Sequence, residues 1–259
     1  MESDSESEGW DGDATQLDIL LALSPDLMLC DLTKGEFQIQ GRPLYINDFG
    51  KLEYPYGGST FLAALMLAKH MEYRLADEIR GSTVLELGAG TGTLGLTAAA
   101  LGAGEVVTTD LEYCIPNLEK SIALNKDVWL EHSRAPKIRA MTLDWFKFDS
   151  RALPKVDFII GAELIFEEEL LPPLVNLMCA LTDRNPEAVL LMSFRDRGII
   201  TEDEVVEALG PYFDLKLICP RDMAKKYRVV QNEDIRLWRF TRRPETLRPV
   251  AYLMLENRR

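Results

Sequence analysis

Residues 83–95 read TVLELGAGTGTLG, so that a short apolar run leads directly into four glycines within eight residues. The apolar run is typical of a buried strand, and TLGLTAAALG at 93–102 is typical of a helix. Glycines between a strand and a helix let the backbone turn sharply and approach a ligand closely. The stretch therefore predicts a strand, a ligand-binding loop and a helix, with Gly95 as a packing residue and Gly102 as the helix stop.

Two classes of ligand fit this loop. The pattern GxGxxG at 90–95 matches the dinucleotide fingerprint, and ExGxGxG at 86–92 matches that of S-adenosylmethionine binders. Asp110 ends the next apolar run, EVVTTD, where an acid can bind both ribose hydroxyls, but both classes share this acid. Glu86 separates them, because a carboxylate there would repel a pyrophosphate at the helix N-terminus and suits a cationic sulfonium and ammonium.

Around this loop, strand-like and helix-like segments alternate along the chain, which predicts an α/β fold with a doubly wound, mostly parallel sheet. The expected strands are 83–87, 105–110, 137–145, 156–164, 187–194, 212–220 and 234–242. The expected helices are 93–102, 113–125, 167–182 and 202–210, and Pro172 and Pro173 must lie in the first turn of the third or kink it. A hairpin around Gly41-Arg42 in residues 36–47 and a buried helix at 59–73 come before the first strand.

Composition narrows the class of protein. The chain has 259 residues, 47% of them apolar, which suits one large α/β domain. A net charge of −13 argues against a direct nucleic-acid partner, and no apolar stretch reaches the roughly 18 residues of a membrane span. The first ten residues, MESDSESEGW, do not resemble a secretory signal.

The cysteine and histidine content argues against a metal site. The four cysteines lie far apart without a CxxC pair, and the chain has two histidines. This favours a reducing compartment, so we expect a cytoplasmic and possibly also nuclear protein, without a metal ion. We also expect a monomer.

Four motifs in order carry a family resemblance: ELGAGTG at 86–92, TTD at 108–110, LDW at 143–145 and GAELIF at 161–166. Together they resemble the seven-strand class I methyltransferases, and in particular the family-16 group of protein lysine methyltransferases that act on elongation factors and chaperones. The resemblance covers roughly residues 36–242. It implies a Rossmann-like sheet whose last strand is antiparallel, the cofactor S-adenosylmethionine with S-adenosylhomocysteine as product, and a protein substrate.

The resemblance also implies the site residues. In it, the glycine loop surrounds the methionine and ribose parts of the cofactor, Asp110 binds the ribose hydroxyls, and the residues after the second and third strands lie beside the adenine. The implied cofactor site comprises Glu86, Gly88, Gly90, Gly92, Asp110, Leu111, Asp144, Trp145 and Ala162. Asp144 as a plain turn residue and Trp145 as a core residue are open alternatives.

Three residues resemble positions on the substrate side of the family. Tyr54 and Pro55 in EYPYGGSTFLA resemble a W-P element before the helix, with tyrosine in place of tryptophan. Arg197 in SFRDRG resembles an arginine after the fifth strand, although a surface salt bridge explains it equally well.

The segment after the fourth strand is expected to hold the acceptor. Where many family members have D-x-x-Y, this chain has Glu163-Leu-Ile-Phe166. Methyl transfer is a one-step displacement that needs a neutral, in-line nucleophile, and lysine has a pKa near ~10.4, so a proton must leave first. Glu163 can orient the ammonium and Phe166 can hold it by a cation–π contact, so both are the candidate catalytic residues.

Several functions stay open at this point. Lysine is the first choice of acceptor, and arginine the second, because carboxylates bind a guanidinium in a bidentate way. The missing tyrosine hydroxyl also allows a non-catalytic binding protein, and an NAD-linked oxidoreductase or a small-molecule N-methyltransferase shares the fold class. Glu167, Glu168 and Glu169 are better explained as the acidic first turn of a helix than as part of the site.

The expected organisation has four parts. Residues 1–16 form a disordered acidic tail, 17–80 a hairpin and helix packed on the core, 81–242 the methyltransferase domain, and 243–259 a basic segment. The bases Arg239, Arg242, Arg243 and Arg248 are expected to form a solvated strand end and tail, with a docking surface as the alternative.

Overall fold

A computed structural model of the chain describes residues 30–48, 57–126, 137–195, 201–218 and 235–244. The acidic tail at 1–16 and the predicted site residues Tyr54, Pro55 and Arg197 lie outside these ranges, as does Arg248, so the predictions made for them stay predictions. In the described part of the chain, none of the helices combines the length and the apolar content that crossing a bilayer requires.

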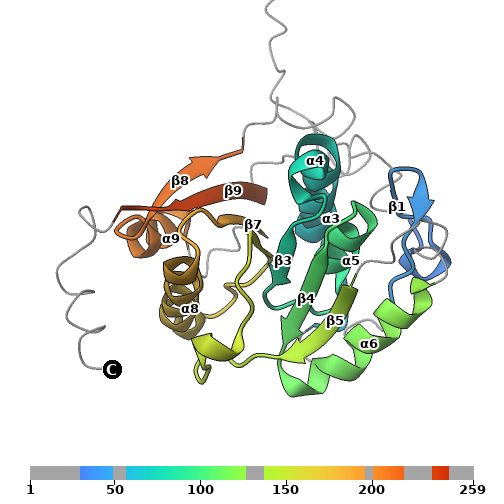
Figure 1. Ribbon diagram of the computed structural model, residues 1–259, viewed down its shortest axis with the longest axis horizontal. Helices are drawn as coiled ribbons and strands as arrows, with labels where there is room; N and C mark the ends of the chain where they lie inside the picture. The colour runs from blue at the N-terminus through green and yellow to red at the C-terminus, as the bar shows by residue number, and fades with distance from the viewer. Residues whose placement is uncertain (1–29, 49–56, 127–136, 196–200, 219–234, 245–259) are drawn as a thin grey trace, which may run out of the picture.

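One seven-stranded sheet forms the centre of the molecule (Figure 1). Its strands are β3 (Thr83–Glu86), β4 (Glu105–Asp110), β5 (Lys137–Thr142), β6 (Phe158–Ala162), β7 (Val189–Arg195), β8 (Phe213–Leu217) and β9 (Ile235–Arg242). They lie in the order β5-β4-β3-β6-β7-β9-β8, and β9 is antiparallel to both of its neighbours. The predicted doubly wound sheet with an antiparallel last strand is therefore confirmed.

Helices cover both faces of the sheet, and the strands alternate their side chains between two cores. Val84, Val106 and Ile160 face one core, which also contains residues of α3 (Leu62–His70) and α5 (Thr93–Ala100). Leu85 of β3 and Val107 of β4 face the other core. This core also contains residues of α8 (Leu171–Arg184) and α9 (Glu202–Leu209). This period of two is what places an apolar layer on each face of a buried strand.

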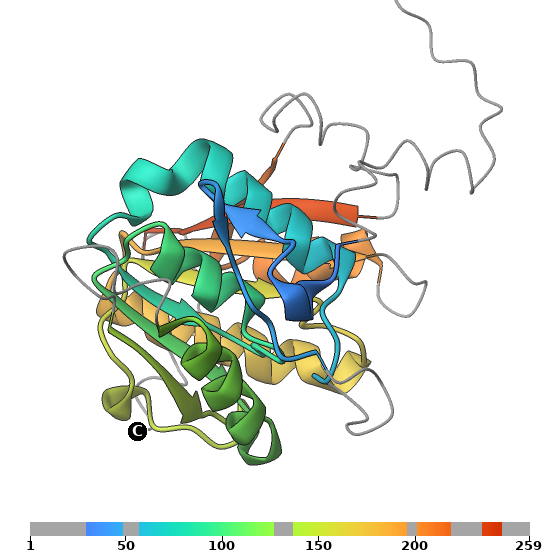
Figure 2. The same ribbon diagram turned by 90° about the vertical axis from the view of Figure 1, so that its right-hand side faces the viewer.

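The N-terminal segment packs on the first of these layers (Figure 2). Its strands β1 (Gln38–Ile39) and β2 (Arg42–Pro43) form the predicted hairpin, although the turn is Gln40-Gly41, one residue earlier than expected. Both turn residues have positive φ (52° and 75°), as a tight hairpin requires. Lys69 of α3 lies 4.9 Å from the centre of the Phe37 ring, which fastens the hairpin to the helix.

The helix expected at 59–73 begins and ends later than predicted. It begins at Leu62 and continues through a π-helical turn (Met71–Leu75) into α4 (Ala76–Ile79). The prediction ended too early because Glu72, Tyr73 and Arg74 are polar or exposed, whereas Met71, Leu75 and Ile79 remain buried at a spacing of four residues. That spacing was the signal for a longer helix.

The helix α8 confirms the prediction that two prolines can lie in its first turn. α8 begins at Leu171, so Pro172 and Pro173 lie in its first turn, where a missing backbone N–H costs nothing. Glu168 and Glu169 lie in a 3-10 turn directly before it, as expected for an acidic helix start. Glu167 precedes this turn and lines the cavity at the ends of the strands, so the prediction that it lies outside the site is wrong.

The prediction of a solvated strand end is wrong for Arg242. Arg242 is the last residue of β9, and its side chain is fully buried, with Nη2 at 2.7 Å from Asp183 Oδ1. Its guanidinium also lies 5.2 Å from the centre of the Phe213 ring. Because β9 is inserted between β7 and β8, Arg242 at its end is enclosed by neighbouring elements, whereas Arg239 and Arg243 are partly exposed and form ion pairs. Arg239 likewise lies 3.7 Å from Glu78, and Arg243 lies 2.9 Å from Asp214.

Candidate functional site

A cavity of about 620 Å³ lies at the carboxyl ends of β3, β4 and β6. The chain runs from β3 outward to β4 and β5, then returns to the other side of β3 to form β6. Ligands of open α/β sheets bind at such a switch point, because the loops diverge there and leave a crevice. The last residues of the three strands, Glu86, Asp110 and Ala162, all line the cavity.

The glycine loop contributes Gly88 and Gly90 to the lining of the cavity, whereas Gly92 does not line it, and the conformation of the loop depends on its glycines. Gly88, Gly90 and Gly92 have φ values of 53°, 53° and 83°, which side chains rarely allow. A Cβ on Gly90 would lie 3.2 Å from the Cα and carbonyl oxygen of Gly57, and one on Gly88 would lie 2.8 Å from the Leu164 side chain. The loop is therefore packed between the segment before α3 and the segment after β6.

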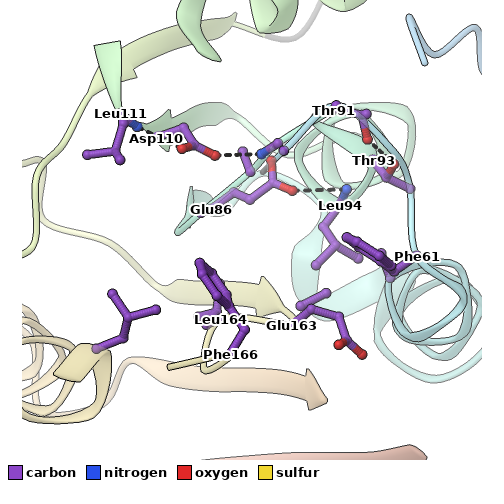
Figure 3. Close-up of a pocket in the computed structure, with 18 of the residues that line it drawn as sticks. Phe61, Glu86, Thr91, Thr93, Leu94, Asp110, Leu111, Glu163, Leu164 and Phe166 are labelled. Atoms are coloured by element: carbon purple, nitrogen blue, oxygen red, sulfur yellow. Dashed lines mark hydrogen bonds between the residues drawn. The ribbon is translucent and has the colours of Figure 1, made fainter. Parts of the chain in front are cut away.

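Glu86 is buried beneath this loop and binds the first turn of α5 (Figure 3). Its carboxylate accepts the N–H groups of Leu94 and Gly95 at 3.1 and 3.0 Å. These backbone donors are the ones that a pyrophosphate would use at a helix N-terminus. The predicted conflict between Glu86 and a dinucleotide thus has a geometric basis.

Gly95 belongs to the same arrangement. A Cβ on Gly95 would lie 2.2 Å from Thr108 Cγ2 and 2.6 Å from Glu86 Oε2. The glycine therefore lets α5 approach the sheet closely, which agrees with the predicted packing role. Gly102, with φ of 93°, follows the end of α5 at Ala100, as expected for a helix stop.

Burial raises the pKa of Glu86 from its ordinary 4.5 to about 8, although the two backbone N–H groups oppose this shift. Between pH 4.5 and about pH 8, Glu86 therefore carries a proton in the folded state but has lost it in the unfolded state. The free energy of unfolding should therefore fall as pH rises from about 4.5 to about 8, by at most about 1.4 kcal/mol per pH unit from this residue. Urea denaturation across this range should show a smaller decline for Glu86→Gln than for the wild type, and equal declines would contradict the assignment.

Asp110, the last residue of the neighbouring strand β4, holds the glycine loop by a hydrogen bond. One carboxylate oxygen accepts the Gly90 N–H at 2.7 Å, and the other accepts the N–H of Leu111, also at 2.7 Å. Burial raises the pKa of Asp110, and these two donors oppose the shift. The carboxylate lines the cavity next to the glycines, where it can accept hydrogen bonds from a pair of vicinal hydroxyls.

The segment after β5 forms a further wall of the cavity, where Asp144 and Trp145 have structural contacts and also line the cavity, so their role beside a cofactor stays a prediction. Asp144 Oδ1 accepts the Phe146 N–H at 2.9 Å, so Asp144 is a turn residue, and it also lines the cavity. Trp145 is half-buried against the core, and its ring lies 3.3 Å from the position that a Gly88 Cβ would take. Leu111, which is 42% exposed, lies at the rim.

Glu163 and Phe166 lie across the cavity from Glu86 and Asp110 (Figure 3). Glu163 directly follows β6 and has φ of 55°, a left-handed conformation that costs a residue with a side chain on the order of 1 kcal/mol. Its N–H donates to the Ser193 carbonyl at 2.8 Å, which helps to hold this conformation. The structure therefore brings the candidate acceptor residues and the candidate cofactor residues, except Gly92, to one cavity.

The segment 57–61 lines the cavity and was missed from the sequence. The Thr60 hydroxyl lies 2.7 Å from that of Thr91 and 3.2 Å from that of Thr93, so it joins this segment to the glycine loop. Phe61 follows at the start of α3, near Glu163 in Figure 3. The adjacent pair Gly57-Gly58, directly before a predicted helix, was an available signal. Over the described ranges, no group of three His, Cys, Asp or Glu side chains is placed to hold a metal ion.

Comparison with known proteins identifies a family. A family model described as lysine methyltransferase matches residues 46–207. Protein N-lysine methyltransferase METTL21A of Xenopus tropicalis is 33% identical over 135 residues, covering 52% of this chain and 59% of the relative. EEF1A lysine methyltransferase 3 of the same organism is 30% identical, covering 52% and 56%. Histone-arginine methyltransferase METTL23 of Homo sapiens is 28% identical, covering 60% and 77%.

These matches cover part of each protein, since the chain spans less than two thirds of the length of the first two relatives. Among solved structures, a TehB-like SAM-dependent methyltransferase from Corynebacterium glutamicum superposes with a TM-score of 0.50 at 18% identity, covering 72% of this chain and 90% of that one. This likeness concerns the fold. The family match, which extends over more than half of the sequence, shows that the chain belongs to the lysine methyltransferase family.

Proposed function

We propose that the protein is an S-adenosylmethionine-dependent methyltransferase that modifies a lysine side chain of a protein substrate. The observation that carries the proposal is the single cavity with Glu86 and Asp110 on one side and Glu163 and Phe166 on the other. The family match and the names of the relatives METTL21A and EEF1A lysine methyltransferase 3 support it.

The residues present fit this cofactor better than a dinucleotide. Glu86 occupies the α5 N–H groups that a pyrophosphate needs. Besides Glu86, whose pKa is raised to about 8, four acidic residues are among the described residues that line the cavity, and none is Lys or Arg, which suits a cationic ligand. Asp110 would bind the ribose hydroxyls, and the loop at 88–92 would pack against the methionine part. When bound, the cofactor supplies an electrophilic methyl group on a sulfonium.

The opposite wall suits a lysine acceptor. The acceptor nitrogen must be neutral when it attacks, and burial among apolar side chains such as Phe61 and Phe166 favours the neutral amine. Glu163 would orient the incoming ammonium, and Phe166 would hold it by a cation–π contact until its proton is lost. No covalent intermediate with the protein is needed, so positioning is the main contribution of these residues.

An arginine acceptor is the second candidate. Glu163 and Glu167 both line this end of the cavity, and two carboxylates suit a guanidinium. The similarity to METTL23, which is named a histone-arginine methyltransferase, favours the same possibility. An elongation factor or chaperone is the substrate class that the family resemblance suggests. The cytoplasmic or nuclear localisation, the monomeric state and the lack of a nucleic-acid partner stay predictions from the sequence.

A ligand panel tests the cofactor assignment. The melting temperature of the purified chain should rise with S-adenosylmethionine and S-adenosylhomocysteine, because a ligand that binds only the folded state stabilises it. NAD and NADP should produce no comparable rise. Stabilisation by the nicotinamide cofactors alone would instead support an oxidoreductase and overturn the proposal.

A further inference from the structure

We propose that Ser193 is a positioning residue for methyl transfer, which fixes Glu163 and the first turn of α3 in one arrangement. The inference rests on the function proposed above, because it takes Glu163 and the first turn of α3 to lie beside the methyl acceptor. We call this part of the cavity, lined by Phe61, Ala64, Glu163 and Phe166, the acceptor end. Ser193 itself is fully buried in β7 and does not line the cavity. It therefore acts through its two contacts rather than on the substrate.

The first contact fixes the backbone of Glu163. The Ser193 carbonyl accepts the Glu163 N–H at 2.8 Å, directly after the parallel pairing of β6 with β7 has ended at Ala162 and Ser193. Glu163 is left-handed at this point, with φ of 55°. A residue in such a conformation needs surrounding contacts to stay there, and this hydrogen bond is one of them.

The second contact reaches a distant part of the chain. Ser193 Oγ donates to the carbonyl oxygen of Ala63 at 2.9 Å, across 130 residues of sequence. Ala63 lies in the first turn of α3, where the Phe61 carbonyl accepts the N–H groups of Ala64 and Leu65 at 3.0 and 3.3 Å. Phe61 and Ala64 both line the cavity, so the hydroxyl fixes the turn that carries them.

The two contacts together link two elements that line the cavity, the first turn of α3 and Glu163 after β6, through one residue. The hydroxyl sets the position of α3 relative to β7, and the carbonyl sets the position of Glu163 relative to the same strand. Loss of the hydroxyl should let the turn that carries Phe61 shift against Glu163. Displacements of about 1 Å in a reacting geometry lower rates up to about a hundredfold, so the effect should appear in kcat. The cofactor residues Glu86 and Asp110 belong to other strands and should keep their affinity.

The test compares Ser193→Ala with Thr182→Val. Thr182 is also fully buried, and its hydroxyl donates to a helix carbonyl, that of Met178, at 2.7 Å, in α8 and away from the lining of the cavity. Both variants lose one buried hydroxyl with little change in shape. We expect Ser193→Ala to lower kcat about tenfold or more, with the dissociation constant of S-adenosylhomocysteine changed by less than about twofold. Thr182→Val should keep the wild-type kcat although it loses stability.

A second measurement does not depend on catalysis. Hydrogen exchange of the Ala64 and Leu65 amides, which lie in the turn that the hydroxyl holds, should be about tenfold or more faster in Ser193→Ala than in the wild type and unchanged in Thr182→Val. The Glu163 amide keeps its acceptor in this variant, because alanine has the same backbone carbonyl. A kcat of Ser193→Ala equal to that of Thr182→Val, in an active enzyme, would overturn the inference. If the wild type transfers no methyl group, the proposed function fails, and hydrogen exchange decides whether the Ser193 hydroxyl holds the first turn of α3. Equal exchange in all three proteins would then overturn the inference by itself.

Discussion

Glu163→Gln is expected to lower the rate of methyl transfer about a hundredfold at saturating cofactor, in the range typical of a misplaced reacting group. Glutamine keeps the length of the side chain and the left-handed backbone, but it removes the charge that orients an ammonium in the cavity. Binding of S-adenosylhomocysteine should be unchanged, because Glu163 lies across the cavity from Glu86 and Asp110. Single-turnover rates and calorimetric titrations would measure the two quantities separately.

Glu169→Gln is the matched control for this variant. Glu169 is an exposed acid a few residues further along the same segment, and it does not line the cavity. It should keep the wild-type rate, which separates the role of Glu163 from the general negative charge of this surface. Equal rates for Glu163→Gln and the wild type would show that the acceptor does not depend on this carboxylate. Cofactor binding by a wild type without any turnover would favour a non-catalytic binding protein.

Asp110→Ala is expected to weaken binding of S-adenosylhomocysteine by about tenfold to a hundredfold. The variant loses a charged acceptor for the ribose hydroxyls, and such hydrogen bonds contribute on the order of 1.5–3 kcal/mol each. It also removes the bond that holds the Gly90 N–H at 2.7 Å, so the loop should become less well ordered. Isothermal titration calorimetry of the purified variant measures the change in affinity.

Asp157→Ala provides the comparison for Asp110→Ala. Asp157 accepts the Thr83 N–H at 2.8 Å at the opposite end of β3, so it makes a similar carboxylate–backbone bond away from the cavity. Its loss should affect the free energy of unfolding but leave the affinity for S-adenosylhomocysteine unchanged. If both variants bind equally well, Asp110 does not contact the cofactor.

The fold could be predicted from the sequence because its signals are local. TVLEL and EVVTTD are apolar runs of strand length, each followed by a helix-like segment, and this alternation is sufficient for a parallel sheet. The glycine loop was visible because its φ values exclude most other residues. The ends of the strands then placed Glu86, Asp110 and Glu163 at one edge of the sheet, where the cavity lies.

The remaining features depend on contacts between residues far apart in sequence. Glu86 was expected to face a ligand, but no pattern in the neighbouring sequence indicated that its carboxylate accepts N–H groups of the first turn of α5. Arg242 appeared to be solvated because the insertion of β9 between β7 and β8 is a property of the whole sheet. The bond between Ser193 and Ala63 spans 130 residues, and no periodicity predicts it.

The most direct test of the proposed function is the chemical identity of the methylated residue. Cell lysate proteins would be incubated with methyl-labelled S-adenosylmethionine and either the wild type or Glu163→Gln, then hydrolysed to amino acids and separated. Label in methylated lysine that depends on the wild-type enzyme is the result that the proposal predicts. Label in methylated arginine instead, or no enzyme-dependent label from a chain that binds the cofactor, would contradict it.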